Sequence, residues 1–345
     1  MPLALSILDQ STIVSGRDAA QAIQETLEVA RLADRLGYAR YWLAEHHNSQ
    51  SHAGSAPEIV ISAIGATTRR IRVGSAGIML PHYSALKVAE QFRALEAVAP
   101  GRIDLGLGRA PGSDGRTAYA LNPNAATAAD NFPSAVRDLL GWLGDGLPEQ
   151  HPFREVRASP EVPTVPEVWI LGSSDYGAQV AAFFGLPYCF AYFITDGQGC
   201  AEALNTYRET FRELRGQKAH AAIGIYALAA DTEAEAERLF ASRALWRLHR
   251  DRGIYPPLPS AEEAAAYPYS EAEQAKVVRM RARAIIGTGA QVRARISALA
   301  GELGVQEVAI LTPCHDPAAR RRSVTLIAEA FGLTEVPCLQ EQEQV

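Results

Sequence analysis

Three histidines within a short stretch are the clearest candidates for acid–base chemistry in this chain. His46 and His47 follow an apolar run that we predict to be a strand, and adjacent side chains of an extended chain point to opposite sides. His46 continues the inward-facing set, so it is the candidate general acid or base, with Glu45 or His47 orienting it. A purely structural histidine is the alternative. A metal site that also uses His52 is disfavoured, because no HExxH pattern and no nearby cysteine accompany it.

An arginine at the end of another predicted strand could bind a phosphate. Arg109 stands in the run LGLGRAPG, which begins at Leu105. The run resembles the dinucleotide fingerprint GxGxxG, but Pro111 occupies the position of the third glycine, so the match fails. What remains is a guanidinium beside glycines, which suits a phosphate clamp. An ion pair at the rim of the fold is the alternative.

Hydroxyl groups follow the next predicted strand, at the start of a helix. The run GSSDYG contains Ser173, Ser174 and Tyr176. Hydroxyls together with the free amides of a helix start favour an anion site, and helix capping by Ser174 or Asp175 is compatible with it. Because the two strand ends are neighbours, Arg109 and the serines are expected to bind one phosphate jointly. We assign Tyr176 to the same cofactor-binding set.

Small residues at the end of a third predicted strand leave room beside the backbone. Ala76 and Gly77 lie in the run GSAGIMLP, which begins at Gly74. Glycine and alanine let a flat group approach the main chain closely. The alternative is a tapering barrel interior that requires small side chains at this level.

Short apolar runs alternate with helical patterns along most of the chain, which is typical of a parallel sheet built from βα units. We predict strands over 3–8, 41–44, 71–80, 102–108, 168–171, 188–193, 221–229 and 307–312. We predict helices over about 18–36, 57–68, 84–98, 125–143, 176–184, 200–215 and 290–303. These elements place every candidate near the end of a strand or in the segment that follows it.

The repeats favour a (β/α)8 TIM barrel with insertions over an open doubly wound sheet, which normally carries a glycine-rich loop after its first strand. We expect one domain over residues 1–333, with irregular insertions near 144–166 and 250–275 and a polar tail over 334–345. Long loops inside compact domains often cover sites, so 250–275 is a candidate lid.

Composition narrows the class of partner. The chain has 345 residues, 48% hydrophobic types and a net charge of −6, which argues against nucleic acid and anionic membranes. No apolar run reaches the length of a membrane span, and the N-terminal run lacks the basic start of a signal peptide. The four cysteines, including Cys338, form no CxxC pair or zinc spacing. We therefore expect a cytoplasmic protein that acts on a small molecule and contains no metal.

Several motifs resemble those of the bacterial-luciferase-like monooxygenase family, in its non-luminous branch. The resemblance covers nearly the whole chain, is strongest in the first third, and rests on YWLAEHHN (41–48), IRVG (71–74), AEQF (89–92), PGRIDLGLGR (100–109), LGSS (171–174), GLP (185–187) and IGT (286–288). One position departs from the light-emitting subunit, where a reactive cysteine precedes the phosphate arginine. Gly108 stands here, which weakens any expectation of light emission.

The resemblance implies a barrel whose mouth binds reduced FMN. Arg109 matches the phosphate arginine of the family, and Ser173 and Ser174 fall in its phosphate loop. Ala76-Gly77 matches the place of a non-proline cis peptide that supports the flavin ring. His46 matches the histidine proposed to act in catalysis. The resemblance also implies that 250–275 is a mobile lid and that the chain dimerises through helices after the second and third strands.

The function that follows is an FMN-dependent monooxygenase, which uses O2 and reduced FMN from a separate NAD(P)H:flavin reductase to oxidise a small organic substrate. A deazaflavin-dependent hydride-transfer enzyme is the first alternative, since a branch of the family works in that way. A flavin-binding protein without turnover is the second.

Overall fold

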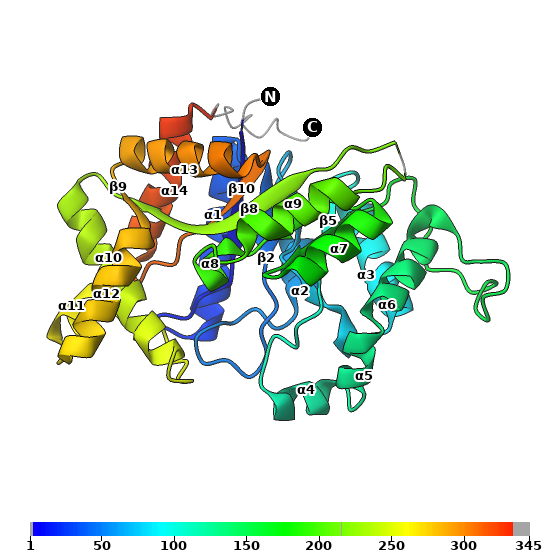
Figure 1. Cartoon of the computed structure of the whole chain (residues 1–345), viewed down its shortest axis with the longest axis horizontal. Coiled ribbons are helices and arrows are strands. Elements are labelled where there is room, and N and C mark those ends of the chain that lie inside the picture. Colours follow the sequence, from blue (N-terminus) through cyan, green and yellow to red (C-terminus); the bar gives the residue numbers. More distant parts are fainter. Residues whose placement is uncertain (1–2, 215, 334–345) are drawn as a thin grey trace, which may run out of the picture.

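Eight parallel strands close into a barrel in the computed structural model, which describes residues 3–214 and 216–333 (Figure 1). Strand β10 pairs with both β1 and β8, and this double pairing closes the ring. In order around the barrel the strands are β1 (Ala4–Asp9), β2 (Arg40–Leu43), β3 (Arg72–Ser75), β5 (Ile103–Gly108), β6 (Glu167–Gly172), β7 (Tyr188–Phe190), β8 (Ala221–Ala229) and β10 (Glu307–Leu311). The predicted (β/α)8 barrel is confirmed.

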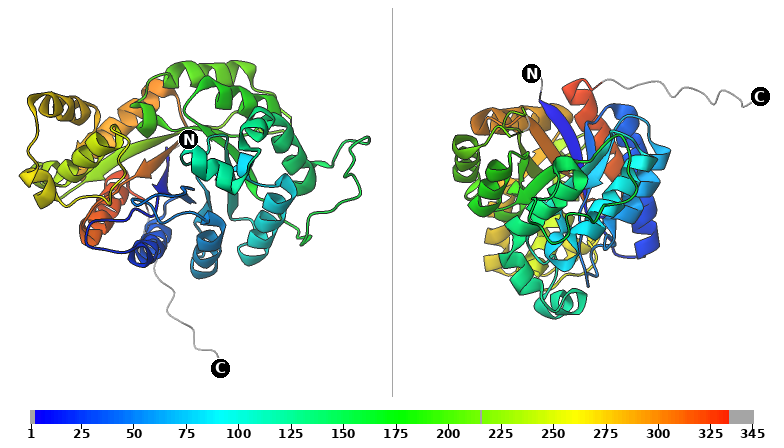
Figure 2. Two further views of the ribbon diagram at one scale, coloured as in Figure 1. Left: turned by 90° about the horizontal axis from the view of Figure 1, so that it is seen from below. Right: turned by 90° about the vertical axis from the view of Figure 1, so that its right-hand side faces the viewer.

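Helices surround the strands on the outside (Figure 2). The outer helices include α1 (Ala19–Leu36), α2 (Pro57–Thr67), α3 (Ala85–Val98), α6 (Phe132–Leu140), α7 (Asp175–Phe184), α9 (Cys200–Thr210), α13 (Gly289–Leu303) and α14 (Pro317–Phe331). Helix α1 shows why they form: Asp18 and Gln21 make a capping box at its start, and its buried residues Thr26, Val29, Ala30 and Ala33 recur at helical spacing toward the strands. Burial of such faces between strands and helices forms the main core.

Four predicted elements differ from the observed ones. The strand predicted over 71–80 is interrupted at Ala76-Gly77, giving β3, a short β4 (Ile78–Met79) and a 3-10 turn, Leu80–His82. The strand over 188–193 ends at Phe190, before α8 (Tyr192–Thr195), and the helix over 200–215 ends at Thr210. The helix over 125–143 is α5 (Ala125–Asp130), α6 and a π-helical turn (Gly141–Asp145), because Pro133 lacks the amide that a continuous helix needs and suits the start of a new one.

The segment predicted to be an irregular lid, 250–275, contains regular helix as well as irregular chain. It follows α10 (Glu233–Arg250) and contains α11 (Ala261–Ala266) and the start of α12 (Glu271–Arg283), which leads to β9 (Ile285–Gly287) beside β8. Capping boxes at Ser260 and Ser270 start the two helices, and these are the signals that the prediction overlooked. The other insertion, over 144–166, forms an extended excursion after the π-helical turn, with α4 (Gly115–Leu121) and α5 lying before it in the chain (Figure 2).

Buried charges close the end of the barrel at which the strands begin. Arg40 of β2 donates from Nη1 to Asp104 in β5 at 2.9 Å and to Glu167 in β6 at 2.6 Å. Its Nε lies 3.1 Å from Glu307 Oε1 in β10. The guanidinium also lies over the ring of Trp169, 4.7 Å from its centroid. Removing one member of such a buried cluster leaves a charge uncompensated, so this end holds the fold together.

Above this ionic layer the interior of the barrel is apolar. The rings of Trp42 and Trp169 meet edge to face, with centroids 4.9 Å apart. A cluster of smaller side chains continues upward from them: Leu8, Ala76, Leu171, Cys189, Phe193, Ala222, Ala309 and Leu311. The interior is therefore filled in layers, and its open space begins only at the other end.

Glycine at position 74 is required by the close approach of β3 to β5. A Cβ built on Gly74 would lie 2.2 Å from the carbonyl oxygen of Asp104, a distance that real structures do not contain. We expect Gly74→Ala to lower the free energy of unfolding by at least about 2 kcal/mol, since overpacking a core forces backbone shifts. Gly301→Ala is the matched control, because a Cβ there meets nothing within 4 Å. Equal denaturation midpoints for the two variants would contradict this account.

Some predictions concern residues that the structure does not describe. The polar tail and Cys338 lie outside 3–214 and 216–333. Cys189, Cys200 and Cys314 are buried and unpaired. In the described residues, no helix is both long and apolar enough to cross a membrane.

Candidate active site

A cavity of about 810 Å³ lies at the end of the barrel where the strands finish. Active sites of such barrels lie at this end, in the loops after the strands. The cavity is lined by all seven residues predicted from the sequence: His46, Ala76, Gly77, Arg109, Ser173, Ser174 and Tyr176. The fold therefore brings together side chains that are up to 130 positions apart in the chain, from His46 to Tyr176.

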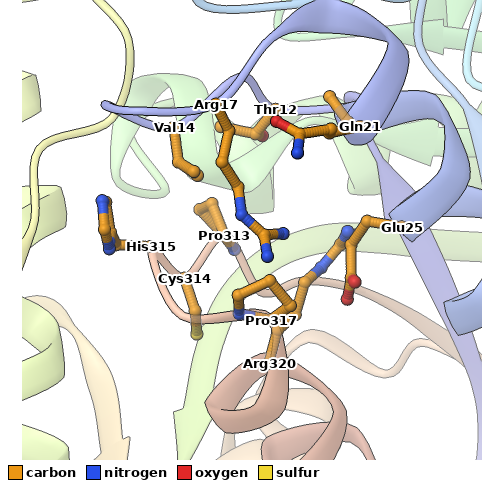
Figure 3. A pocket seen from close by; sticks show the side chains of 11 residues that line it. Thr12, Val14, Arg17, Gln21, Glu25, Pro313, Cys314, His315, Pro317 and Arg320 are labelled. Carbon is orange, nitrogen blue, oxygen red and sulfur yellow. The ribbon is translucent and has the colours of Figure 1, made fainter.

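A second hollow between α1, α14 and the segment that precedes α1 is far smaller (Figure 3). Its volume is about 20 Å³, which suffices for one water molecule and no larger ligand. Arg17, Glu25, Cys314 and Arg320 are among its lining residues. Organic ligands are therefore expected in the larger cavity.

One wall of the large cavity combines a guanidinium with unsatisfied hydroxyls. Arg109 follows β5 and lies over the ring of Tyr176, 4.1 Å from its centroid. No carboxylate of a described residue pairs with it, so the predicted alternative of an ion pair at the rim is wrong. Ser174 is the N-cap of α7, yet its hydroxyl makes no capping bond. The free amides of that helix start and the cation beside them suit a bound anion.

The backbone between β3 and β4 forms a second wall. Gly77 has φ = +116°, a conformation that side chains rarely tolerate, and its backbone passes close to Gly108 of β5. The Ala76–Gly77 peptide bond is trans, so the expected cis bond is wrong. In the described residues the cis bond is Ser159–Pro160. The flat surface beside these small residues is present without it.

His46 contributes an imidazole that carries no hydrogen bond at Nδ1. Its ring stacks on that of His52, with centroids 4.5 Å apart, and its Nδ1 is buried without a partner in the described part of the chain. Burial lowers the pKa of His46 to about 4, while the charge of Glu45 opposes this shift and that of His47 adds to it. At neutral pH the ring is therefore uncharged and able to accept a proton.

The predicted orienting role of Glu45 toward His46 is wrong. Glu45 is 1% exposed and accepts hydrogen bonds from Tyr83 Oη at 2.8 Å and from the amide of Met79 at 3.0 Å. It also pairs with Nε2 of His47 at 2.7 Å. Glu45 thus connects β4 with the loop that follows β2. His52 positions the ring of His46 instead, held by the hydroxyls of Ser49 and Ser51 at 3.1 Å each.

Helix α10 supplies a wall of which the sequence analysis predicted only Arg250, the first residue of the candidate lid. Arg243, Trp246 and Arg250 line the cavity and share one face of the helix, at positions i, i+3 and i+7. The ring of Trp246 meets that of His52, with centroids 5.8 Å apart. The only signal in the sequence is the helical spacing of these charged and aromatic residues. That spacing does not indicate a cavity wall unless the position of α10 is known.

The predicted lid contributes only its first residues to the cavity. Gly253 and Tyr255 line it together with Arg250. The chain after them is fixed to the loop that follows β1, because Leu258 exchanges backbone hydrogen bonds with Ile13 and Ser15 at 2.8 and 2.9 Å. Trp246 donates to the carbonyl of Pro256 at 3.0 Å. The segment therefore covers one side of the cavity.

Metal ligands do not gather in the part of the chain that the structure describes. No group of three or more His, Cys, Asp or Glu side chains there could hold an ion. His52 stacks on His46 rather than pointing at a shared centre with it.

Comparison with known proteins agrees with the fold and the cavity. The sequence model of a family described as luciferase-like monooxygenase matches residues 3–307. The chain is 39% identical over 326 residues to a luciferase-like monooxygenase of Escherichia coli strain K12, covering 94% of this chain and 96% of that protein. It is 36% identical over 330 residues to N-acetyl-S-alkylcysteine monooxygenase of Bacillus subtilis strain 168, covering 95% and 98%.

Solved structures share the fold along the whole chain. The structure of apo-MsnO8 superposes with a TM-score of 0.87 at 36% identity, covering 97% of this chain and 99% of that one. Two more distant structures show the shared fold alone. They are the oxygenating constituent of 3,6-diketocamphane monooxygenase in complex with FMN (TM-score 0.69, 20% identity) and an F420-dependent secondary alcohol dehydrogenase (0.68, 14%). The chain belongs to the luciferase-like monooxygenase family and is an oxidoreductase.

Proposed function

We propose that this protein is a flavin-dependent monooxygenase that uses reduced FMN and O2 to oxidise a small organic molecule. One observation carries the proposal: a single cavity combines an unpaired guanidinium and free hydroxyls at a helix start with a glycine-lined wall and an uncharged histidine. The first two features fit the phosphate of FMN, and the wall fits its flat ring. The FMN complex of the 3,6-diketocamphane enzyme, which has the same fold, supports this choice of flavin.

Each group of the chain has a defined task in this proposal. Arg109, Ser173 and Ser174 would hold the phosphate, with Tyr176 supporting the guanidinium from its other face. Ala76 and Gly77 would let the ring lie against the backbone. Bound reduced FMN supplies the activation of O2. His46, which lines the cavity, would accept a proton during attack on the substrate.

Two partners belong to the same proposal. A separate NAD(P)H:flavin reductase would deliver reduced FMN, since the run that resembles the nicotinamide fingerprint fails it at Pro111. A homodimer would use the outer face of α2, where Ile59 is 68% exposed and Ala63 and Ala66 are also exposed.

Anaerobic titration with reduced flavins tests the cofactor. We expect reduced FMN to bind more tightly than reduced riboflavin or reduced F420, and the bound form to reoxidise more slowly in O2 than free reduced FMN. Tighter binding of F420 would favour the hydride-transfer alternative. Binding of FMN without any effect on its reoxidation would favour a flavin carrier.

The substrate is first sought among thioethers. The activity that names the Bacillus subtilis relative makes N-acetyl-S-benzylcysteine a suitable trial compound. Oxygen uptake that depends on this compound, with reduced FMN supplied continuously, is the expected result. Consumption of O2 that the compound leaves unchanged would exclude it.

A further inference from the structure

A second cation in the cavity lacks a counter-ion. Arg243 of α10 lines the cavity and is 6% exposed. Its guanidinium lies over the ring of Tyr226, 3.9 Å from the centroid, and makes no hydrogen bond or ion pair with any described residue. Burial lowers the pKa of Arg243 only to about 10, so the group is protonated at neutral pH.

The neighbouring arginines of α10 differ from Arg243 in this respect. Arg247 forms a two-point pair with Asp196 at 2.7 and 3.0 Å, and Arg250 pairs with Asp251 at 2.9 Å. Arg238 binds Glu235 at 2.8 Å. A buried cation without such a partner is costly. Its position on the cavity wall indicates that a ligand supplies the negative charge.

Arg243 stands apart from the anion site at Arg109. Arg109 follows β5 and Arg243 follows β8, so the two lie three strands apart around the eight-stranded ring. Arg243 instead shares its helix face with Trp246, and the rings of Trp246, His52 and His46 contact one another in turn. An anion held by Arg243 is therefore on the side of the cavity to which His46 is connected.

The other charged groups of the cavity do not compete for Arg243. Glu45 is bound by Tyr83, Met79 and His47, and Asp114 by Asn48 and Thr117. Asp196, whose negative charge raises the pKa of Arg243, is held by Arg247. The remaining wall nearby is apolar and includes Phe193 and Leu311. A ligand with one acidic end and an apolar body matches these surroundings.

We propose that Arg243 binds the carboxylate of an anionic organic substrate and directs its apolar part past Trp246 toward His46. This inference deepens the proposed function. The oxidation of the substrate rests on the proposed function, but the binding of the acid by Arg243 does not. The paired hydrogen bonds of a guanidinium suit a carboxylate better than a neutral amide.

Matched acids and amides test the proposal by binding alone. The probes are N-acetyl-S-benzylcysteine and 4-phenylbutyrate, each compared with its primary amide by calorimetric titration of the flavin-free protein. We expect at least one acid to bind about tenfold or more tightly than its amide, as charge-assisted hydrogen bonds require. Arg243→Met should abolish this preference, and Arg243→Lys should retain part of it.

Arg250→Met is the matched control, since it removes a paired guanidinium from the same face. It should keep the preference for the acid. Three results overturn the proposal: no acid binds better than its amide, Arg243→Met keeps the preference, or Arg250→Met or Arg109→Met removes it instead. Loss of thermal stability in Arg243→Met with an unchanged preference would show a structural role only, through Tyr226.

Reduced FMN is titrated separately into the same variants. Arg243→Met should leave its dissociation constant unchanged. If the wild-type protein fails to bind FMN but prefers the acid, the proposed cofactor fails while the role of Arg243 stands. If FMN binds normally and no acid is preferred, only the role of Arg243 fails.

Discussion

Replacing Arg109 with Ala is expected to weaken the binding of reduced FMN about 100-fold, because hydrogen bonds to a charged group contribute roughly 2–3 kcal/mol. The guanidinium has no competing carboxylate and is held by the ring of Tyr176. Its loss therefore acts on the ligand and not on an internal ion pair. Arg109→Lys should recover part of the affinity, since it keeps the charge but loses the planar fork.

Riboflavin, which lacks the phosphate, separates this effect from a general disturbance of the cavity. Its affinity should be the same for the wild-type protein and for Arg109→Ala. Arg116→Ala provides the control for net charge, because Arg116 is exposed on the nearby helix α4 and does not line the cavity. An equal loss of riboflavin and FMN affinity would contradict the assignment of Arg109 to the phosphate.

Replacing His46 with Ala is expected to lower the turnover of N-acetyl-S-benzylcysteine by about 10²–10⁴-fold, the usual contribution of a general acid or base. The affinity for reduced FMN should change little, since the phosphate site lies on other strands. His249→Gln is the matched control, as His249 lies on α10 and contacts Tyr267. Unchanged turnover in His46→Ala would remove His46 from the mechanism.

The pH profile gives an independent test of the same residue. With a pKa of about 4, His46 is uncharged throughout the physiological range and becomes protonated only as the pH falls toward that value. The acceptor is therefore fully available above about pH 5, and kcat/KM should show no step near pH 6.5, where a free histidine titrates. His52, stacked on it with a pKa of about 3, adds no step there either. A step near 6.5 that disappears in His46→Ala would contradict the effect of burial.

Local patterns predicted most of the barrel because most of its strands contain a short apolar run. Strand β8 is buried along all of its nine residues, which is the reason that Ala221–Ala229 reads clearly as a strand. Helix α10 was not predicted, although Ala236, Phe240, Ala244 and Leu248 recur every four residues, because buried arginines lie between them on its inner face. Buried Arg243 and Arg247 replace the leucines that such a pattern requires.

The residues of the candidate site also fall into those that could be predicted from the sequence and those that could not. Residues directly after a strand, such as Arg109 and Ser174, are placed by the barrel alone and could be predicted. Contacts between distant segments could not: the stacking of His52 on His46 and the position of Trp246 beside it depend on where α10 packs. The predicted contact of Glu45 with His46 was wrong for the same reason, because Tyr83 and Met79 approach Glu45 from the segment after β3.

The ionic layer around Arg40 and the two tryptophans above it close one end of the barrel, so the cavity opens only at the other end. Whatever occupies the inner part of the cavity has to pass the outer part on its way in and on its way out. When two ligands are held there together and one lies deeper than the other, the deeper ligand has to enter first and leave last. For an enzyme of that kind the shape of the barrel alone imposes ordered kinetics, before any contact between the ligands is considered.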